Sequence, residues 1–169
     1  MSLLIVNTMN SQNEKVQEII RKLSEGKEAC EVIHTENMKI THCIGCNACW
    51  LKTPGICAIK DDYEILLKAF IRYDDILFIS GTSLGFVTPQ MKNIIDRILP
   101  LVTMFTCFKD GQIRHVGRYN TSYRFGLIYD GEADKEYMNL WMHRVAINMA
   151  GTSLGAYPLS DMEEVSICI

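Results

Sequence analysis

The chain of 169 residues lacks the features expected of a membrane protein, an exported protein or a nucleic-acid-binding protein. No apolar run approaches the ~18–20 residues that a helix needs to span a bilayer. The opening segment, MSLLIVNTMN, has no cationic stretch, long apolar stretch or small-residue cleavage site, so no signal peptide is expected. Lysine and arginine are scattered and the net charge is −3, which predicts no phosphate-binding basic surface. We therefore expect a cytoplasmic protein with no membrane or nucleic-acid partner.

Repeats, low-complexity segments and interdomain linkers are also missing from the sequence, which predicts one domain over residues 1–169. No glycine-rich dinucleotide fingerprint is present. The histidines, which are His34, His42, His115 and His143, have no serine or carboxylate pattern around them. We therefore assign no catalytic side chain from the sequence.

Short apolar runs alternate with amphipathic segments along the chain. Strands are expected at 3–7, 30–35, 75–80, 122–130 and 153–160. Helices are expected within 8–26, where Asn10 or Ser11 would be the N-cap, and at 61–74, 89–105 and 133–149. This order predicts an α/β fold with a parallel sheet covered on both faces. Ligands of such sheets bind beyond the carboxyl ends of the strands, so the loops 8–14, 80–88 and 129–135 are the candidate sites.

Four of the seven cysteines lie in one segment with the spacing C-x2-C-x2-C-x7-C. They are Cys43, Cys46, Cys49 and Cys57. In a chain without export these are expected to be thiols or metal ligands rather than disulfides. Closely spaced cysteines on a looping backbone, with a Pro54–Gly55 turn, favour a [4Fe–4S] cluster. Zinc and a site without metal remain alternatives. Cys30, Cys107 and Cys168 are interpreted as structural or incidental.

Two segments resemble a known family. CIGCNACWLKTPGICAIKDD, residues 43–62, and GTSLGFVTPQMKNIIDR, residues 81–97, are similar to the cysteine motif and the flavin-facing loop of iron–sulfur flavoproteins. These are part of the NADPH-dependent FMN reductase superfamily. The resemblance implies a flavodoxin-like three-layer sandwich with five parallel strands in the order 2-1-3-4-5. The cysteine-rich segment 41–60 would be an insertion loop in that fold.

The same resemblance implies FMN at the switch point of the sheet, electron transfer between FMN and the cluster, and a homodimer or tetramer. A small redox carrier or NAD(P)H would be the partner. The expected FMN contacts are Thr8, Asn10, Ser11, Asn13, Thr82, Ser83, Leu84, Gly85, Phe86, Tyr129 and Gly131. The family's glycine is missing from the loop 8–15, and its Pro-x-Tyr is missing after the third strand. A polar N-capping loop, packing by Leu84 and Phe86, and a turn capped by Asp134 are the alternative interpretations.

Three functions are therefore compared. The first is an oxidoreductase that passes electrons between a [4Fe–4S] cluster and FMN. The second is an NAD(P)H-dependent FMN or quinone reductase that has no cluster. The third is a non-enzymatic zinc- or thiol-containing protein on the same fold. Lys92, Asp96 and Arg97 are expected to form surface ion pairs on one helix and receive no catalytic role.

Overall fold

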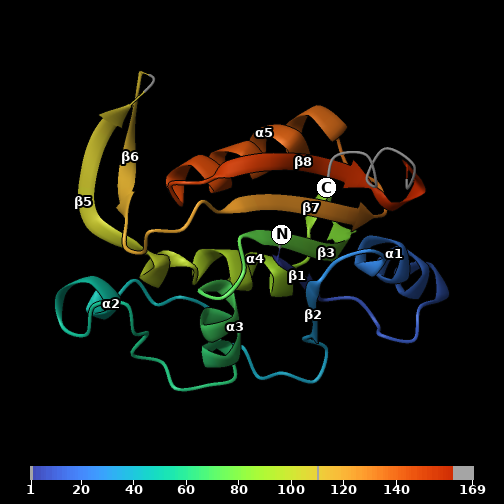
Figure 1. Cartoon of the computed structure of the whole chain (residues 1–169), viewed down its shortest axis with the longest axis horizontal. Coiled ribbons are helices and arrows are strands. Elements are labelled where there is room, and N and C mark those ends of the chain that lie inside the picture. Colours follow the sequence, from blue (N-terminus) through green and yellow to red (C-terminus); the bar gives the residue numbers. More distant parts are fainter. Residues whose placement is uncertain (1, 110, 162–169) are drawn as a thin grey trace.

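A computed structural model describes residues 2–109 and 111–161 (Figure 1), so Cys168 lies outside the described residues. The first half of the described chain contains β1 (Ser2–Asn7), α1 (Glu14–Ser24), β2 (Ala29–His34), α2 (Ala48–Leu51), α3 (Tyr63–Phe70), β3 (Asp75–Ser83) and β4 (Phe86–Val87). The second half contains α4 (Pro89–Asp96), the 3-10 turn η1 (Leu99–Leu101), β5 (Val102–Lys109), β6 (Gln112–Gly117), β7 (Arg124–Asp130), α5 (Lys135–Asn148), β8 (Thr152–Pro158) and the 3-10 turn η2 (Leu159–Asp161).

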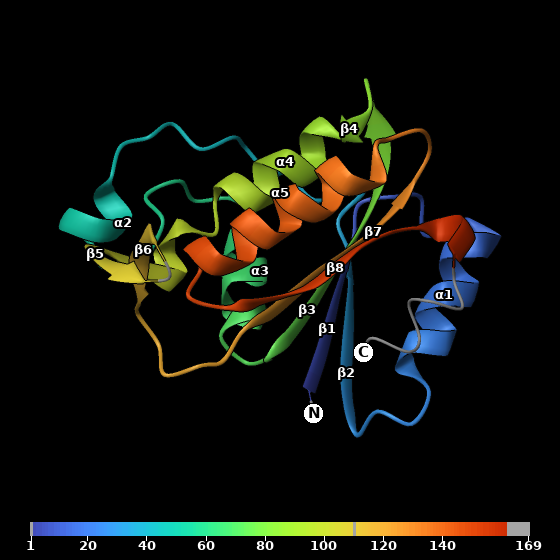
Figure 2. The same cartoon turned by 90° about the horizontal axis from the view of Figure 1, so that it is seen from above.

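Five parallel strands form the central sheet in the order β2-β1-β3-β7-β8. Counted along the chain without the short and hairpin strands, this is the predicted order 2-1-3-4-5, which is confirmed. The short strand β4 adds an antiparallel extension to β3. Figure 2 shows α1 on one side of the sheet and α3, α4 and α5 on the other.

The two faces of the sheet are buried by alternate residues of the same strands, because successive side chains of a strand point to opposite faces. On β1, Leu4 and Val6 belong to the core beneath α3, α4 and α5. Leu3 and Ile5 belong to the core beneath α1. A strand buried on both faces reads as a continuous apolar run, which is why LLIVN predicted it.

The helix predicted over 89–105 is wrong beyond its first half. Helix α4 ends at Asp96, and Pro100 lies in η1, where its missing N–H and fixed φ do not allow the helix to continue. The segment 102–109 is the strand β5, which forms an antiparallel hairpin with β6. Figure 1 shows this hairpin standing apart from the central sheet, beside the end that carries α2.

The starts of three helices test the expected caps. Asn13, rather than Asn10 or Ser11, caps α1 by accepting hydrogen bonds from the amides of Lys15 and Val16. Thr88 caps α4, and Pro89 follows it in the first turn, where a helix tolerates proline because the missing N–H would have no partner within the helix. The Asp134 carboxylate caps α5, which supports the interpretation of that loop as a capped turn. None of the helices in the described part of the chain has both the length and the apolar character that crossing a bilayer requires.

Candidate functional site

The cysteine segment winds around a small hollow. All four motif cysteines line it, together with Leu99 of η1, and its volume is about 30 Å³. The winding needs left-handed backbone at Gly45, with φ of 65°, and at Asn47, with φ of 54°. Glycine and asparagine are the residues that adopt this conformation most readily. The local sequence IGCNAC therefore places Cys43, Cys46 and Cys49 around the same hollow as Cys57.

The donor set of this hollow fits a sulfur-ligated metal group, since four thiols are the ligands of [4Fe–4S] clusters and of many structural zinc ions. Burial, reinforced by the negative charge that Cys57, Cys43 and Cys46 would carry, raises the pKa of the Cys49 thiol. A cationic group among the thiols would lower that pKa again. Within the described ranges, however, no three His, Cys, Asp or Glu side chains are gathered closely enough to hold a single metal ion.

Arg97 fastens the cysteine segment to the rest of the fold. Its side chain is only 1% exposed, and Nη1 donates to Asp61 Oδ2 at 2.6 Å and to the Thr41 carbonyl at 2.9 Å. Nη2 donates to Cys57 Sγ at 3.4 Å, and the guanidinium lies 4.3 Å from the centre of the Tyr63 ring. Burial raises the pKa of Asp61, but the hydrogen bonds from Arg97 and the Thr41 amide outweigh it, so the net pKa is lowered. One guanidinium therefore connects both ends of the cysteine segment.

The hairpin β5–β6 and the turn after it support the other side of the cysteine segment. Trp50 Nε1 donates to the Leu99 carbonyl at 3.0 Å, and its ring lies 4.9 Å from that of His115. Arg118 donates to the carbonyls of Pro100, Val102 and Cys49. Gly55 has φ of 83°, and a Cβ there would lie 3.0 Å from Tyr119 Oη. The turn before Cys57 is thus held against residues that follow β6.

The loop after β3, predicted as a flavin contact, is a tight hairpin rather than an open loop. Thr82 and Ser83 pair with β4, and Leu84 and Gly85 form the turn with φ of 52° and 74°. Leu84 is fully exposed, whereas the Phe86 ring packs 4.8 Å from Trp141 and 5.8 Å from Tyr137. Phe86 therefore packs against α5, and Leu84 is the apolar side chain left free at this edge.

The loop after β7 meets the loop after β3 at Gly131. A Cβ at Gly131 would lie 2.2 Å from Thr82 Oγ1, so only glycine fits here, at φ of 117°. The Tyr129 side chain is buried, and burial raises its pKa, so at this edge Tyr129 offers backbone groups only. The fold brings Thr82 and Gly131 together as the switch-point geometry predicted.

The loop after β1 already satisfies most of its own hydrogen-bond donors. Thr8 donates through its amide and its hydroxyl to the Ile79 carbonyl. The side-chain oxygens of Asn7, Asn10 and Asn13 accept from the amides of Met9, Gln12, Lys15 and Val16. Ser11 donates through its amide and its hydroxyl to the carboxylate of Glu36, at 3.0 and 2.6 Å. The polar residues expected here are in place, but they are turned toward partners within the chain.

Helix α4 connects the two candidate sites. Its N-cap is Thr88, whose amide donates to the Gly81 carbonyl beside the loops predicted to contact flavin, and its C-cap is Arg97, which contacts Cys57. A helix rises 1.5 Å per residue, so the two ends of α4 are roughly 12 Å apart. The expected surface ion pair between Lys92 and Asp96 is present on the exposed face of this helix. Arg97, expected to belong to the same surface, is buried instead.

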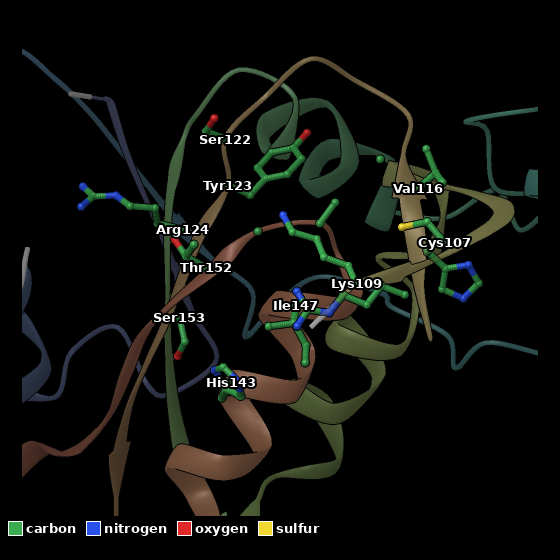
Figure 3. Close-up of a pocket in the computed structure, with 15 residues that line it drawn as sticks. Cys107, Lys109, Val116, Ser122, Tyr123, Arg124, His143, Ile147, Thr152 and Ser153 are labelled. Carbon is green, nitrogen blue, oxygen red and sulfur yellow. The ribbon is translucent and has the colours of Figure 1, made fainter. Parts of the chain in front are cut away.

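A cavity of about 790 Å³ lies at the opposite edge of the sheet, where β7 and β8 begin. Figure 3 shows Cys107 and Val116 of the hairpin on one side of it, and His143, Thr152 and Ser153 on the other. Arg124 is one of the basic residues that line the cavity, and its guanidinium forms two 2.6 Å contacts with the Asp75 carboxylate. These contacts neutralise part of the positive charge of the lining. Cys107 is exposed on β5 and does not follow a helix as the sequence suggested. This edge is not the one at which parallel sheets bind ligands.

Sequence reasoning assigned neither Arg97 nor Glu36 to the two sites, and it named Asp61 only within the segment that resembles the iron–sulfur flavoprotein motif. Arg97 and Asp61 are 36 positions apart, and Ser11 and Glu36 are 25 apart, so no local pattern connects them. The Asp-Asp pair at 61–62 was the one available signal, because it follows Cys57 closely. Its carboxylates accept from the amides of Thr41 and Lys39 and close the base of the cysteine segment.

Comparison with known proteins gives sequence relatives over part of the chain. No protein-family model matches it. An iron–sulfur flavoprotein of Archaeoglobus fulgidus is 40% identical over 103 residues, which is 57% of this chain and 48% of that protein. An iron–sulfur flavoprotein of Methanocaldococcus jannaschii is 35% identical over 86 residues, covering 51% of this chain and 44% of that protein. The chain spans about half the length of the curated relatives it matches.

Solved structures match over nearly the whole described fold. The NAD(P)H:quinone oxidoreductase of Methanothermobacter marburgensis has a TM-score of 0.62 at 13% identity and covers 99% of this chain and 93% of its own. The flavodoxin of Megasphaera elsdenii has a TM-score of 0.54 at 13% identity and covers 98% and 96%. At this identity the likeness shows the fold alone. The chain thus has a flavodoxin-like fold and, over about half its length, is similar in sequence to iron–sulfur flavoproteins, as its cysteine motif indicated.

Proposed function

We propose that this chain is an electron-transfer oxidoreductase that holds a [4Fe–4S] cluster on Cys43, Cys46, Cys49 and Cys57 and a flavin at the carboxyl edge of its sheet. The observation that carries the proposal is that all four motif cysteines line one hollow. When bound, the cluster supplies one-electron exchange and the flavin supplies one- or two-electron exchange. The sequence similarity to proteins named iron–sulfur flavoprotein supports the same pairing of groups.

The residues around the thiols are suited to holding such a cluster. Arg97 brings a buried positive charge and an N–H donor to Cys57, and hydrogen bonds to ligand sulfurs are a recognised means of setting a cluster's potential. In the described part of the chain, Arg97 Nε is buried and has no hydrogen-bond partner. A sulfur-rich group beside Cys57 would give this donor an acceptor. Cys46 is exposed, which places one edge of the hollow within reach of a redox partner.

At the carboxyl edge of the sheet, the chain provides a surface for the flavin ring. The Thr82–Gly131 contact and the Leu84–Gly85 turn bring backbone groups and one free apolar side chain to the switch point. These residues would position the ring and limit the access of water to it. Tyr129 and Gly131 would contribute backbone groups, whereas Phe86 would support the turn from behind by packing on α5.

A second copy of the chain is the partner we propose for the hairpin β5–β6. Phe108 and Ile113 lie opposite each other on its two strands and are 77% and 70% exposed. Phe105 and Met104 on the same hairpin are also exposed. An apolar patch of this kind is typical of an interaction surface rather than of a monomer's surface. The hairpin also packs on the cysteine segment through the contact of His115 with Trp50, so a dimer through it would bring two cysteine segments into one assembly.

The alternative is a flavin-dependent NAD(P)H or quinone reductase without a cluster. It is favoured by the finding that no three candidate ligands among the described residues are gathered for a single ion. Under this alternative the cysteine segment is a structural loop, and flavin binding is independent of its thiols. A non-enzymatic protein that holds zinc on the four thiols is the third outcome to distinguish.

Metal, sulfide and flavin analysis of anaerobically isolated protein tests these proposals. We expect about four irons and four sulfides per chain, together with flavin. Cys46→Ser should lose iron and sulfide, whereas the matched control Cys107→Ser, an exposed cysteine on the hairpin, should keep both. Flavin without iron in the wild type supports the cluster-free reductase. One zinc per chain without flavin supports the third function and contradicts the proposal.

A further inference from the structure

The carboxylate of Glu36, which follows β2, lies against the loop 8–14 at the place where that loop would bind an anionic ligand. The Ser11 amide and hydroxyl both donate to it, one to each oxygen, at 3.0 and 2.6 Å. Ser11 precedes α1 and follows β1, at the edge where parallel sheets bind ligands. Donors at such a strand-to-helix loop bind phosphates in many proteins. In this chain the anion that they bind belongs to the chain itself.

The placement of Glu36 is fixed by the residue before it. Thr35 is completely buried, and its amide and hydroxyl donate to the Asn7 carbonyl at 2.9 and 3.2 Å. The Gln90 side chain, on α4, donates to the Thr35 carbonyl at 2.8 Å. Glu36 is therefore held against the loop by anchors on β1 and α4, although its own side chain is exposed. The hydrogen bonds from Ser11 also lower the pKa of Glu36 from its ordinary value.

Most backbone amides of the loop and of the first turn of α1 already have acceptors within the chain. The amides that already donate within the chain are those of Thr8, Met9, Ser11, Gln12, Asn13, Lys15, Val16 and Gln17. Glu14 adds a second negative charge at the first position of α1. A phosphate entering here must break existing hydrogen bonds and approach carboxylates, both of which oppose its binding.

We propose that Glu36 is a specificity-determining residue that occupies the phosphate position of this loop and disfavours FMN relative to a flavin without phosphate. This inference rests on the proposed flavin site. It predicts that the wild-type chain gains little affinity from the flavin phosphate. Without the charge of Glu36, the amide and hydroxyl of Ser11 become available to donate to the phosphate. The site should then prefer FMN.

The test compares FMN with riboflavin, which differ by the phosphate alone. Their dissociation constants are measured anaerobically, by flavin fluorescence, for the wild type, Glu36→Gln and Glu36→Ala. Two unit charges about 4 Å apart in water change an equilibrium about fivefold, and the phosphate carries between one and two charges. We therefore expect FMN to bind at least about fivefold more tightly to both variants, with riboflavin changing less than about twofold.

Glu28→Gln is the matched control, because it removes the same charge from an exposed glutamate at the opposite, amino end of β2. It should leave the ratio of the two affinities unchanged. An unchanged ratio in both Glu36 variants, with flavin still bound, would overturn this inference and leave the proposed function standing. Equal weakening of both flavins would also overturn it, because Glu36 would then be a brace for the loop. Failure of every protein to bind either flavin would refute the flavin site itself.

Discussion

Replacement of Arg97 should destabilise the whole fold, because its guanidinium is buried between three segments. Arg97→Gln removes the contacts to Asp61, Thr41 and Cys57 and leaves the Asp61 carboxylate, only 5% exposed, without its charge partner. Breaking one side of a buried ion pair costs about 3–5 kcal/mol of unfolding free energy. Domains have a total stability of only about 5–15 kcal/mol, so this is a large fraction. For a chain of this length we expect the midpoint of thermal unfolding to fall by roughly 10 °C.

The assay is thermal and urea unfolding, followed by circular dichroism, of the wild type and four variants. Lys92→Gln is the control, since it removes the same charge from the same helix at a residue that pairs with Asp96 on the surface. Exposed pairs contribute about 0–1 kcal/mol, so this variant should be nearly as stable as the wild type. Arg97→Lys keeps the charge but loses the planar donors, and should lie between the two. Asp61→Asn combined with Arg97→Gln should be more stable than Arg97→Gln alone.

The same variants should loosen the cysteine segment before they unfold the chain. Arg97 contacts the Thr41 carbonyl at one end of the segment and Cys57 at the other. In protein without bound metal, the motif thiols of Arg97→Lys should therefore react faster with a maleimide than those of the wild type. Equal stability of Arg97→Gln and Lys92→Gln, with equal thiol reactivity, would refute the view that this guanidinium holds the segment in place.

Three further predictions concern the turn, the pH dependence and the hairpin. Gly55→Ala should lower the free energy of unfolding by about 1–2 kcal/mol more than Gly45→Ala does. Both glycines have positive φ, but only at Gly55 would a Cβ meet Tyr119 and Arg118. Urea unfolding measures the difference, and equal losses would contradict this prediction. The pKa of Asp61 is lower in the folded chain than its ordinary 3.8, so its contribution to stability is present above that value and is lost as the pH falls below it. Unfolding midpoints between pH 6 and pH 3 should therefore fall more for the wild type than for the double Asp61→Asn, Arg97→Gln variant, and parallel curves would refute this. Phe108→Glu should shift light-scattering mass from dimer toward monomer, whereas Glu28→Gln should not; an unchanged dimer would exclude the hairpin as the interface.

The parallel sheet was predictable because its strands are short apolar runs that alternate with amphipathic helices, whereas the strand order came from the resemblance to iron–sulfur flavoproteins. Burial on both faces leaves this signature in the sequence itself, as the alternating cores around β1 show. The hairpin was missed because VTMFTCF is as apolar as a buried helix, and periodicity does not separate the two in short runs. The apolar side chains of the hairpin are exposed, so packing against the core of this chain is not the reason for their apolar character.

The candidate site was predictable as far as its cysteines and loops, and not beyond. Two residues separate each neighbouring pair of Cys43, Cys46 and Cys49, and this short spacing keeps all three beside one hollow. The contacts of Arg97 and Glu36 depend on how distant segments pack, and that information is absent from any short window of sequence. The loop at 8–14 contains the expected polar residues, but their donors bond to Asn7, Asn10 and Glu36 within the chain, which the sequence did not predict.

The most direct test of the central proposal is the iron and sulfide content of anaerobically reconstituted protein, measured for the wild type beside Cys46→Ser and Cys107→Ser. The proposal predicts about four irons and four sulfides per chain in the wild type and in Cys107→Ser, with loss of both in Cys46→Ser. Equal iron and sulfide in all three proteins, or no iron in any of them, would contradict a cluster held by the four motif cysteines.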